Sequence, residues 1–214
     1  MKHARFPAIA LSAFSLALVA CGTPAPAGSS DTGTPPPVEE AQGPITANRG
    51  DRGSVADAIL ESIARHDWQT LSTFAAPAGV RFTPFTHVNP LTDQTLAPAD
   101  IANFETDTSS KTWGTTEGSG EPIVMTNMEY LNRYVWDHDY RTAPDVIWNE
   151  PQTHGSVIDN VQDEYPGAST VEYHFPGFDD QYGGMDWRSL RLVLAQGDDG
   201  NYVLYGVIHD EWTP

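Results

Sequence analysis

Two histidines occupy positions at which an imidazole and a carboxylate could work together. His209-Asp210 ends the last apolar run of the chain, and His174 lies in an alternating run, two residues after Glu172. Such pairs serve as general acids and bases near neutral pH. We therefore take His209 and His174 as candidate catalytic bases, with Asp139 or Asp210 as the carboxylate. For His209 we favour the simpler alternative, in which the ring only bonds a neighbouring carboxylate and fixes the C-terminus. For His174, which shares a strand face with Glu172, an exposed position facing solvent is an equal alternative.

Two acidic segments, residues 137–139 and 178–186, invite a divalent cation, with calcium preferred because their ligands are oxygens. Neither has the alternating acids, central Gly and distal Glu of a calcium loop. The histidines form no His-x-x-x-His or Glu-x-x-His pair, so zinc has no local support either. The sequence also lacks a nucleophile elbow, a phosphate loop and a dinucleotide fingerprint. We predict no metal and no cofactor.

Aromatic residues offer a different kind of site, a pocket for an apolar or sugar ligand. The candidate ligand-binding residues are Trp113, Tyr134, Tyr205 and Trp212. Tryptophan more often supplies packing in a core or a hairpin, and for any single Trp that role is the better interpretation.

In the first half of the domain, apolar residues mostly recur at helical spacing, and in the second half they mostly alternate as in strands. Capping boxes at Ser54-Asp57 and Thr126-Glu129 each predict the start of a helix. We expect helices near 54–65, 68–75, 98–104 and 127–136, and strands near 79–85, 109–116, 146–148, 169–175, 189–195 and 202–209. Helices first and a long antiparallel run last predict an α+β fold, with N-terminal helices packed on a curved antiparallel sheet.

The last strand is apolar on both faces, so it must be covered on both sides. Strict alternation puts Val203, Tyr205, Val207 and His209 on one face. His209 would then stand at the rim of an apolar surface, where burial could tune its titration.

The charge narrows the range of partners. Lys and Arg total 11 and Asp and Glu total 29, and three of each lie in the first 50 residues, so the whole net charge of −18 belongs to residues 51–214. An acidic domain of this kind repels phosphate backbones and anionic lipid head groups. We expect no nucleic-acid partner, whereas cationic ligands are favoured.

The N-terminus has the layout of an export signal. Lys2 and Arg5 form a basic start, an apolar run follows, and Leu18-Val19-Ala20-Cys21 ends it. These four residues resemble the lipobox of bacterial lipoproteins, in which the Cys carries the lipid. The resemblance implies that 1–20 is a signal peptide and that Cys21 is lipidated. It implies a location in the cell envelope, and in the outer membrane where there is one, because Gly22 is not the Asp that favours inner-membrane retention.

A spacer and a single domain follow the proposed anchor. Residues 21–50 are rich in Pro, Gly, Ser and Thr, with too little apolar surface to fold, so we expect a disordered tether. Residues 51–214 are long enough for one globular domain and contain all six Trp. Cys21 is the only Cys, so the domain has no disulfide.

The order of the expected elements is similar to that of the cone-shaped nuclear-transport-factor-2-like (NTF2-like, or SnoaL-like) fold. The amino-acid sequence also resembles that of a group of uncharacterised bacterial envelope proteins, in segments 112–114, 118–123, 129–130, 173–178, 183–187 and 209–212. Cone-shaped relatives include isomerases, dehydratases, hydrolases and proteins that only bind, and fold alone does not choose among them.

Our leading hypothesis is a lipid-anchored envelope protein that binds a small molecule or an envelope component and is not an enzyme. The alternative is an envelope enzyme of the isomerase, dehydratase or hydrolase kind, with a His/Asp pair in the cone cavity. A structural protein without a small ligand is the third possibility. A cavity, and the positions of His174 and His209, would discriminate among them.

Overall fold

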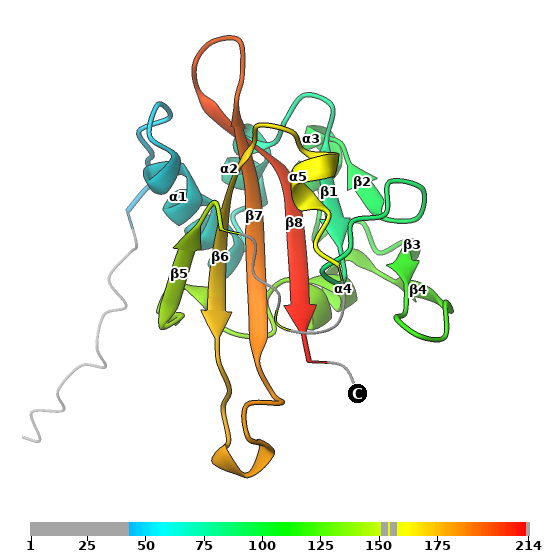
Figure 1. Cartoon of the computed structure of the whole chain (residues 1–214). Helices are drawn as coiled ribbons and strands as arrows, with labels where there is room; N and C mark the ends of the chain where they lie inside the picture. Colours follow the sequence, from blue (N-terminus) through cyan, green and yellow to red (C-terminus); the bar gives the residue numbers. More distant parts are fainter. Residues whose placement is uncertain (1–42, 151–153, 155–157, 213–214) are drawn as a thin grey trace, which may run out of the picture. The chain divides into compact units, whose positions relative to one another are not determined.

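The computed structural model describes residues 43–150, 154 and 158–212 (Figure 1). The signal, the lipidation site Cys21 and most of the expected tether lie outside these residues. The compact unit begins at Gly43. Among the described residues, no helix combines the length and apolar character needed to cross a membrane.

The order of the elements confirms a mixed α+β architecture. The α-helices are α1 (Arg52–Ala64), α2 (Trp68–Phe74), α3 (Pro98–Ala102), α4 (Asn127–Tyr134) and α5 (Val161–Glu164), with 3₁₀ turns η1 (Tyr140–Thr142) and η2 (Asp180–Tyr182). The strands are β1 (Val80–Thr83), β2 (Gln94–Leu96), β3 (Lys111–Thr115), β4 (Pro122–Met125), β5 (Asp145–Trp148), β6 (Ser169–Phe175), β7 (Arg188–Gln196) and β8 (Tyr202–Glu211).

Helix starts follow the capping chemistry, with one correction. Thr126 caps α4 in a capping box with Glu129, as the spacing predicts. At α1 the cap is Asp51 and not Ser54: the Asp51 carboxylate accepts from the Ser54 backbone N–H at 2.7 Å. The helix therefore begins two residues before the expected start, because an Asp three residues upstream of Ser54 offers a charged acceptor to the free N–H groups.

Six strands form one curved sheet in the order β2-β1-β8-β7-β6-β5, and β3 and β4 form a separate hairpin. All pairs in the large sheet are antiparallel except β1 with β8. The three long strands β6, β7 and β8 lie side by side at its centre (Figure 1). Rows of residues across these strands therefore face the same side.

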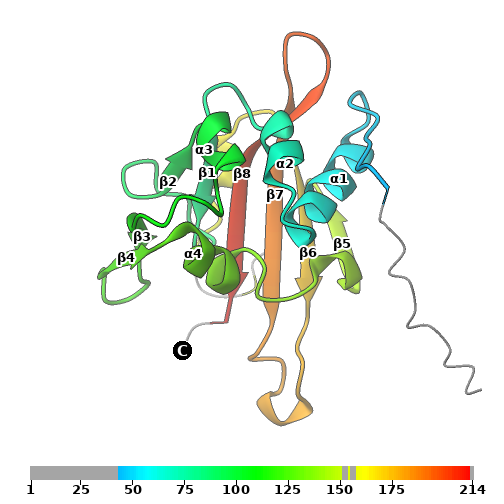
Figure 2. The same cartoon turned by 180° about the vertical axis from the view of Figure 1, so that it is seen from behind.

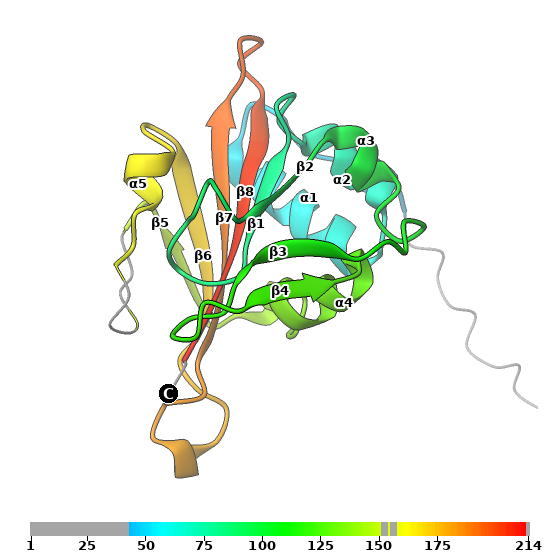
Figure 3. The ribbon, with the colours of Figure 1, turned by 90° about the vertical axis from the view of Figure 1, so that its right-hand side faces the viewer.

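The two sides of this sheet are covered differently. Helices α1 to α4 lie over one side, here called the helix face (Figure 2). On the other side, the outer face, lies α5 (Figure 3). Most of the apolar core lies on the helix face. A smaller apolar cluster lies under α5, where Val161 packs with Val88, Val193 and Ile208.

A bulge corrects the expected alternation of β8. Val193 pairs with Gly206 while Leu194 pairs with Leu204, so Tyr205 has no partner and the faces exchange there. Val207 belongs to the main core, but Tyr205 packs against the small cluster on the outer face. Strict parity placed the two together and was wrong, because one extra residue shifts every later side chain to the other face.

The folded contacts also begin earlier than residue 51. Ile45 and Ala47 pack against the main core, and the Arg49 guanidinium lies 3.9 Å from the ring centre of Phe74. The Arg49 carbonyl accepts a hydrogen bond from the Tyr202 backbone N–H at 2.8 Å. Residues 43–50, expected in the tether, thus contact the domain.

Candidate functional site

The outer face carries a row of polar side chains across the three long strands. His174 on β6 is paired with Ser189 on β7, which is paired with Asp210 on β8. The neighbouring row pairs Glu172 with Arg191. All five are buried. Such residues are rarely buried unless they are paired, so their contacts explain why the sheet accepts them.

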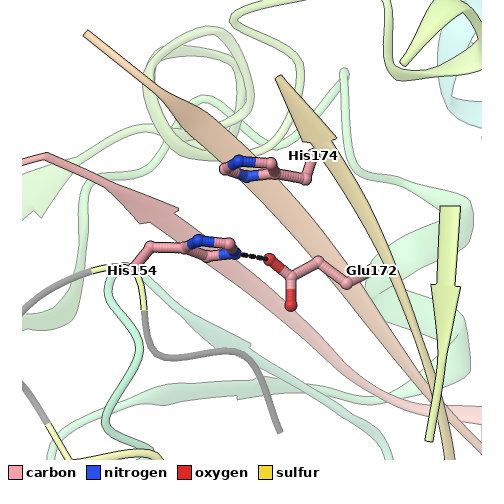
Figure 4. A group of neighbouring side chains, drawn as sticks. All are labelled: His154, Glu172 and His174. Carbon is pink, nitrogen blue, oxygen red and sulfur yellow. Dashed lines mark hydrogen bonds and ion pairs between the residues drawn. The ribbon is translucent and has the colours of Figure 1, made fainter. Parts of the chain in front are cut away.

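Glu172 is the centre of these contacts. Its Oε1 accepts from the Ser189 hydroxyl at 2.6 Å and lies 2.8 Å from His154 Nε2. Its Oε2 accepts from Arg191 Nη2 at 2.8 Å. His154 comes from the connection between β5 and α5, and its ring stacks on that of His174 with 3.9 Å between centroids (Figure 4). Two imidazoles and a carboxylate thus meet although the sequence separates them.

The charge of Glu172 is fixed by its neighbours. Burial alone would raise its pKa, but the hydrogen bond with His154 and the charge of Arg191 outweigh burial and bring the pKa to about 2. Arg191 Nη1 also donates to Asp159 Oδ2 at 2.8 Å, so one guanidinium serves two carboxylates. We call His154, Asp159, Glu172, His174, Ser189 and Arg191 the outer-face cluster.

Two further groups on this face have pKa values shifted by burial. Burial lowers the pKa of His174, and the neighbouring His154 lowers it further. Burial raises the pKa of Asp210 to about 6, even though Thr86 donates a hydrogen bond to its carboxylate. On the outer face, the pKa of Glu172 is therefore lowered, because the hydrogen bond with His154 and the Arg191 charge outweigh burial, whereas the pKa of Asp210 is raised because burial dominates there.

His209, the other candidate base, lies on the helix face and is completely buried. Its Nε2 is 3.5 Å from Asp137 Oδ2, and its ring meets Tyr134 edge to face. Asp137 also accepts from Tyr140 Oη at 2.7 Å and lies 3.3 Å from Arg188 Nε. Burial would raise the pKa of Asp137, but the contacts with His209 and Tyr140 hold it well below its usual range.

The four candidate catalytic residues are therefore distributed over three places. His174 and Asp210 share the outer face with Ser189 between them, and His209 is on the helix face. Asp139 is on an exposed turn, where it pairs with Arg141 at 2.7 Å. The carboxylates that face the two imidazoles are Glu172 and Asp137, which the sequence analysis did not select.

The candidate aromatic residues are also dispersed. Trp113 is fully buried and stacks on Tyr130 at 4.0 Å, while Tyr134 contacts Phe85 in the same core. Tyr205 packs on the outer face, and Trp212 is 37% exposed near the C-terminus. In the core, the apolar space beside Phe82, Phe104 and Leu131 measures about 10 Å³, too little for a small molecule.

A larger cavity, of about 160 Å³, opens beside the outer-face cluster. Its lining includes Glu150, Asp159, Asn160, Asp163, Thr170 and Arg191. Three carboxylates thus surround one guanidinium that is already paired. We call this cavity the Arg191 pocket.

Neither acidic segment gathers metal-binding side chains among the residues the structure describes, and only His154, Glu172 and His174 converge in that way. Asp186 instead accepts from the backbone N–H groups of Phe178 and Asp179 within its own loop. The convergence had a sequence signal, the Glu172-x-His174 spacing on one strand face. No sequence signal pointed to His154, because its position in the long β5–α5 connection does not reveal which strand its side chain contacts.

Comparison with known proteins adds a fold likeness and nothing functional. No protein-family model matches this sequence, and no curated protein matches it. A solved structure described as a putative calcium/calmodulin dependent protein kinase II association domain from Xanthomonas campestris covers 74% of this chain and 84% of its own, with 11% identity and a TM-score of 0.31. At that TM-score the likeness carries no argument about activity.

Proposed function

We propose that the chain is a lipid-anchored binding module of the bacterial cell envelope, held through Cys21 in the outer membrane where one exists. Its domain would be an NTF2-like (SnoaL-like) cone whose ligand site lies on the outer face. The ligand would be a small organic cation bound in the Arg191 pocket.

One observation carries this proposal: a cavity of about 160 Å³ is lined by three carboxylates beside a single guanidinium. Arg191 already contacts Glu172 and Asp159, so it is largely neutralised. Glu150 and Asp163 then leave the pocket with excess negative charge, which attracts an ammonium group. The volume suits a ligand of a few heavy atoms.

Binding is better supported than catalysis. An enzyme of the isomerase, dehydratase or hydrolase kind needs a base that substrate can reach. His209 is fully buried, and Ser189 separates His174 from Asp210. The pairing that the enzyme alternative requires is therefore not assembled.

The test is calorimetric titration of the lipid-anchored chain in detergent with ethanolamine, choline and putrescine, and with acetate as an anionic comparison. We expect saturable binding of at least one ammonium compound and none of acetate. Asp163→Asn should weaken binding at least tenfold, because it removes one of the two lining carboxylates for which the described residues show no guanidinium contact.

The matched control is Asp180→Asn, which makes the same charge change at an exposed acid of η2. It should leave the affinity unchanged. Equal loss in both variants would show general attraction to an acidic surface, and absence of saturable binding would overturn the proposal.

A further inference from the structure

His154, Glu172 and His174 form a second site on the outer face, next to the Arg191 pocket but not part of its lining. Each offers one ligand atom, and these atoms lie within 4.8 Å of one another. We propose that these three side chains bind a divalent transition-metal ion, with zinc as the first probe. The proposal does not depend on ligand binding in the pocket.

The donor set selects the class of ion. Two imidazole nitrogens and one carboxylate oxygen suit zinc and its first-row neighbours, whereas calcium and magnesium prefer oxygen ligands alone. Three protein ligands leave a further coordination position open. His154 is also the most exposed of the three, with 18% of its side chain accessible, so an ion can enter from its side.

Surrounding contacts orient the proposed ligands in the way that metal sites require. Ser189 Oγ lies 2.8 Å from His174 Nδ1, which leaves Nε2 of that ring for the ion. Arg191 holds Glu172 Oε2, so Oε1 is the oxygen that faces His154. Such outer contacts fix ring orientation and carboxylate position in metalloproteins. The Trp187 ring lies beside these ligands, with its centroid 5.1 Å from that of the His154 ring.

The local charge also favours a cation. Within the outer-face cluster, Glu172 and Asp159 share the single guanidinium of Arg191. Two buried carboxylates against one permanent cation leave an excess of negative charge, which is costly away from water. A metal ion between Glu172 and the imidazoles would offset it.

Binding requires one local change. The two imidazole planes are nearly parallel, at 2°, so their nitrogens do not yet converge on one point. The torsion that turns a His ring about its Cβ–Cγ bond is broad, so rotation of His154 is inexpensive. The ion would replace the His154 Nε2 contact with Glu172 Oε1, and any proton held there would leave on binding.

The experiment titrates the EDTA-treated, lipid-anchored chain in detergent with Zn²⁺ and, separately, with Co²⁺ and Ca²⁺. We expect one Zn²⁺ per chain by calorimetry, an absorption band from coordinated Co²⁺, and no binding of Ca²⁺. His154→Ala should weaken Zn²⁺ binding at least a hundredfold, since it removes a direct ligand and not merely a supporting contact.

His87→Ala is the matched control, because it removes an exposed histidine that is outside the site. This variant should bind Zn²⁺ with the affinity of the unchanged chain. His174→Ala is the second ligand variant, and melting without metal shows whether each variant folds. Unchanged Zn²⁺ affinity in a folded His154→Ala chain would overturn the proposal, as would absence of stoichiometric binding. Asp163→Asn should bind Zn²⁺ normally, which separates failure of this site from failure of the pocket.

Discussion

The helix face and the outer face of the same six strands bury their side chains by different means. On the helix face, rings pack against rings: Trp113 stacks on Tyr130, and Phe82 meets both edge to face. On the outer face, Glu172 and Arg191 are as deeply buried but contact each other and further polar groups. Apolar packing depends little on pH, whereas a buried ionic cluster depends on it strongly.

The two buried histidines show the same difference on a smaller scale. His209 is enclosed among core residues and faces Asp137, with no exposed surface. His174 stacks on a second imidazole that is partly exposed. On the helix face, the His209–Asp137 contact thus joins β8 to the turn after α4 and is closed to solvent. On the outer face, His154 keeps the imidazole pair accessible to solvent and ligand.

The largest expected effect is on the helix face. Trp113→Ala should lower the free energy of unfolding by about 3–5 kcal/mol, because it removes a fully buried indole and leaves a cavity. Urea denaturation measures the change, and it should be similar at pH 5 and pH 7. Trp212→Ala, at a partly exposed Trp, should cost about 0.5 kcal/mol. A small loss for Trp113→Ala would mean that the core can collapse around the gap.

The second effect belongs to the outer face and depends on pH. The pKa of Glu172 is lowered from 4.5 to about 2, so the carboxylate contributes stability that is present above pH 4.5 and is lost as pH falls toward 2. Glu172→Gln in EDTA should therefore cost up to about 3.5 kcal/mol at pH 7 and much less at pH 3. Urea denaturation across this range checks it, and a loss independent of pH would contradict the ionic account.

Asp210 should behave in the opposite sense. Its pKa is raised from 3.8 to about 6, so its contribution is complete below pH 3.8 and is lost as pH rises through 6. Relative to Asp210→Asn, the unchanged chain should lose up to about 3 kcal/mol between pH 4 and pH 7. Parallel urea titrations of the two chains measure this difference. Asp180→Asn serves as the exposed control, and a parallel pH profile for Asp210→Asn would be the contrary result.

These contrasts also separate what the sequence could predict from what it could not. Local signals were sufficient for the capping box at Thr126, for the three long strands β6, β7 and β8 and for placing Glu172 and His174 on one face. The bulge at Tyr205 was not predictable, because it depends on how β7 and β8 pair and not on the sequence of β8 alone.

The site shows the same division. Its strand residues follow from period two, but His154 reaches them from the β5–α5 connection, and Asp137 reaches His209 from the turn after α4. Sequence spacing cannot reveal partners brought together by a loop. For that reason Asp139, a neighbour of Asp137 in the sequence, was selected as a catalytic candidate although its side chain points elsewhere and pairs with Arg141.

Asp139 should give the smallest effect of the set. Its carboxylate and Arg141 are each about two-fifths exposed, at 41%, and exposed ion pairs contribute about 0–1 kcal/mol. Asp139→Asn should change the free energy of unfolding by less than about 1 kcal/mol, and a double-mutant cycle with Arg141→Gln should give a coupling in the same range. It should leave Zn²⁺ affinity and ammonium binding unchanged. Loss of either binding activity would instead place Asp139 in a functional site. The proposed sites would then not be confined to the outer face.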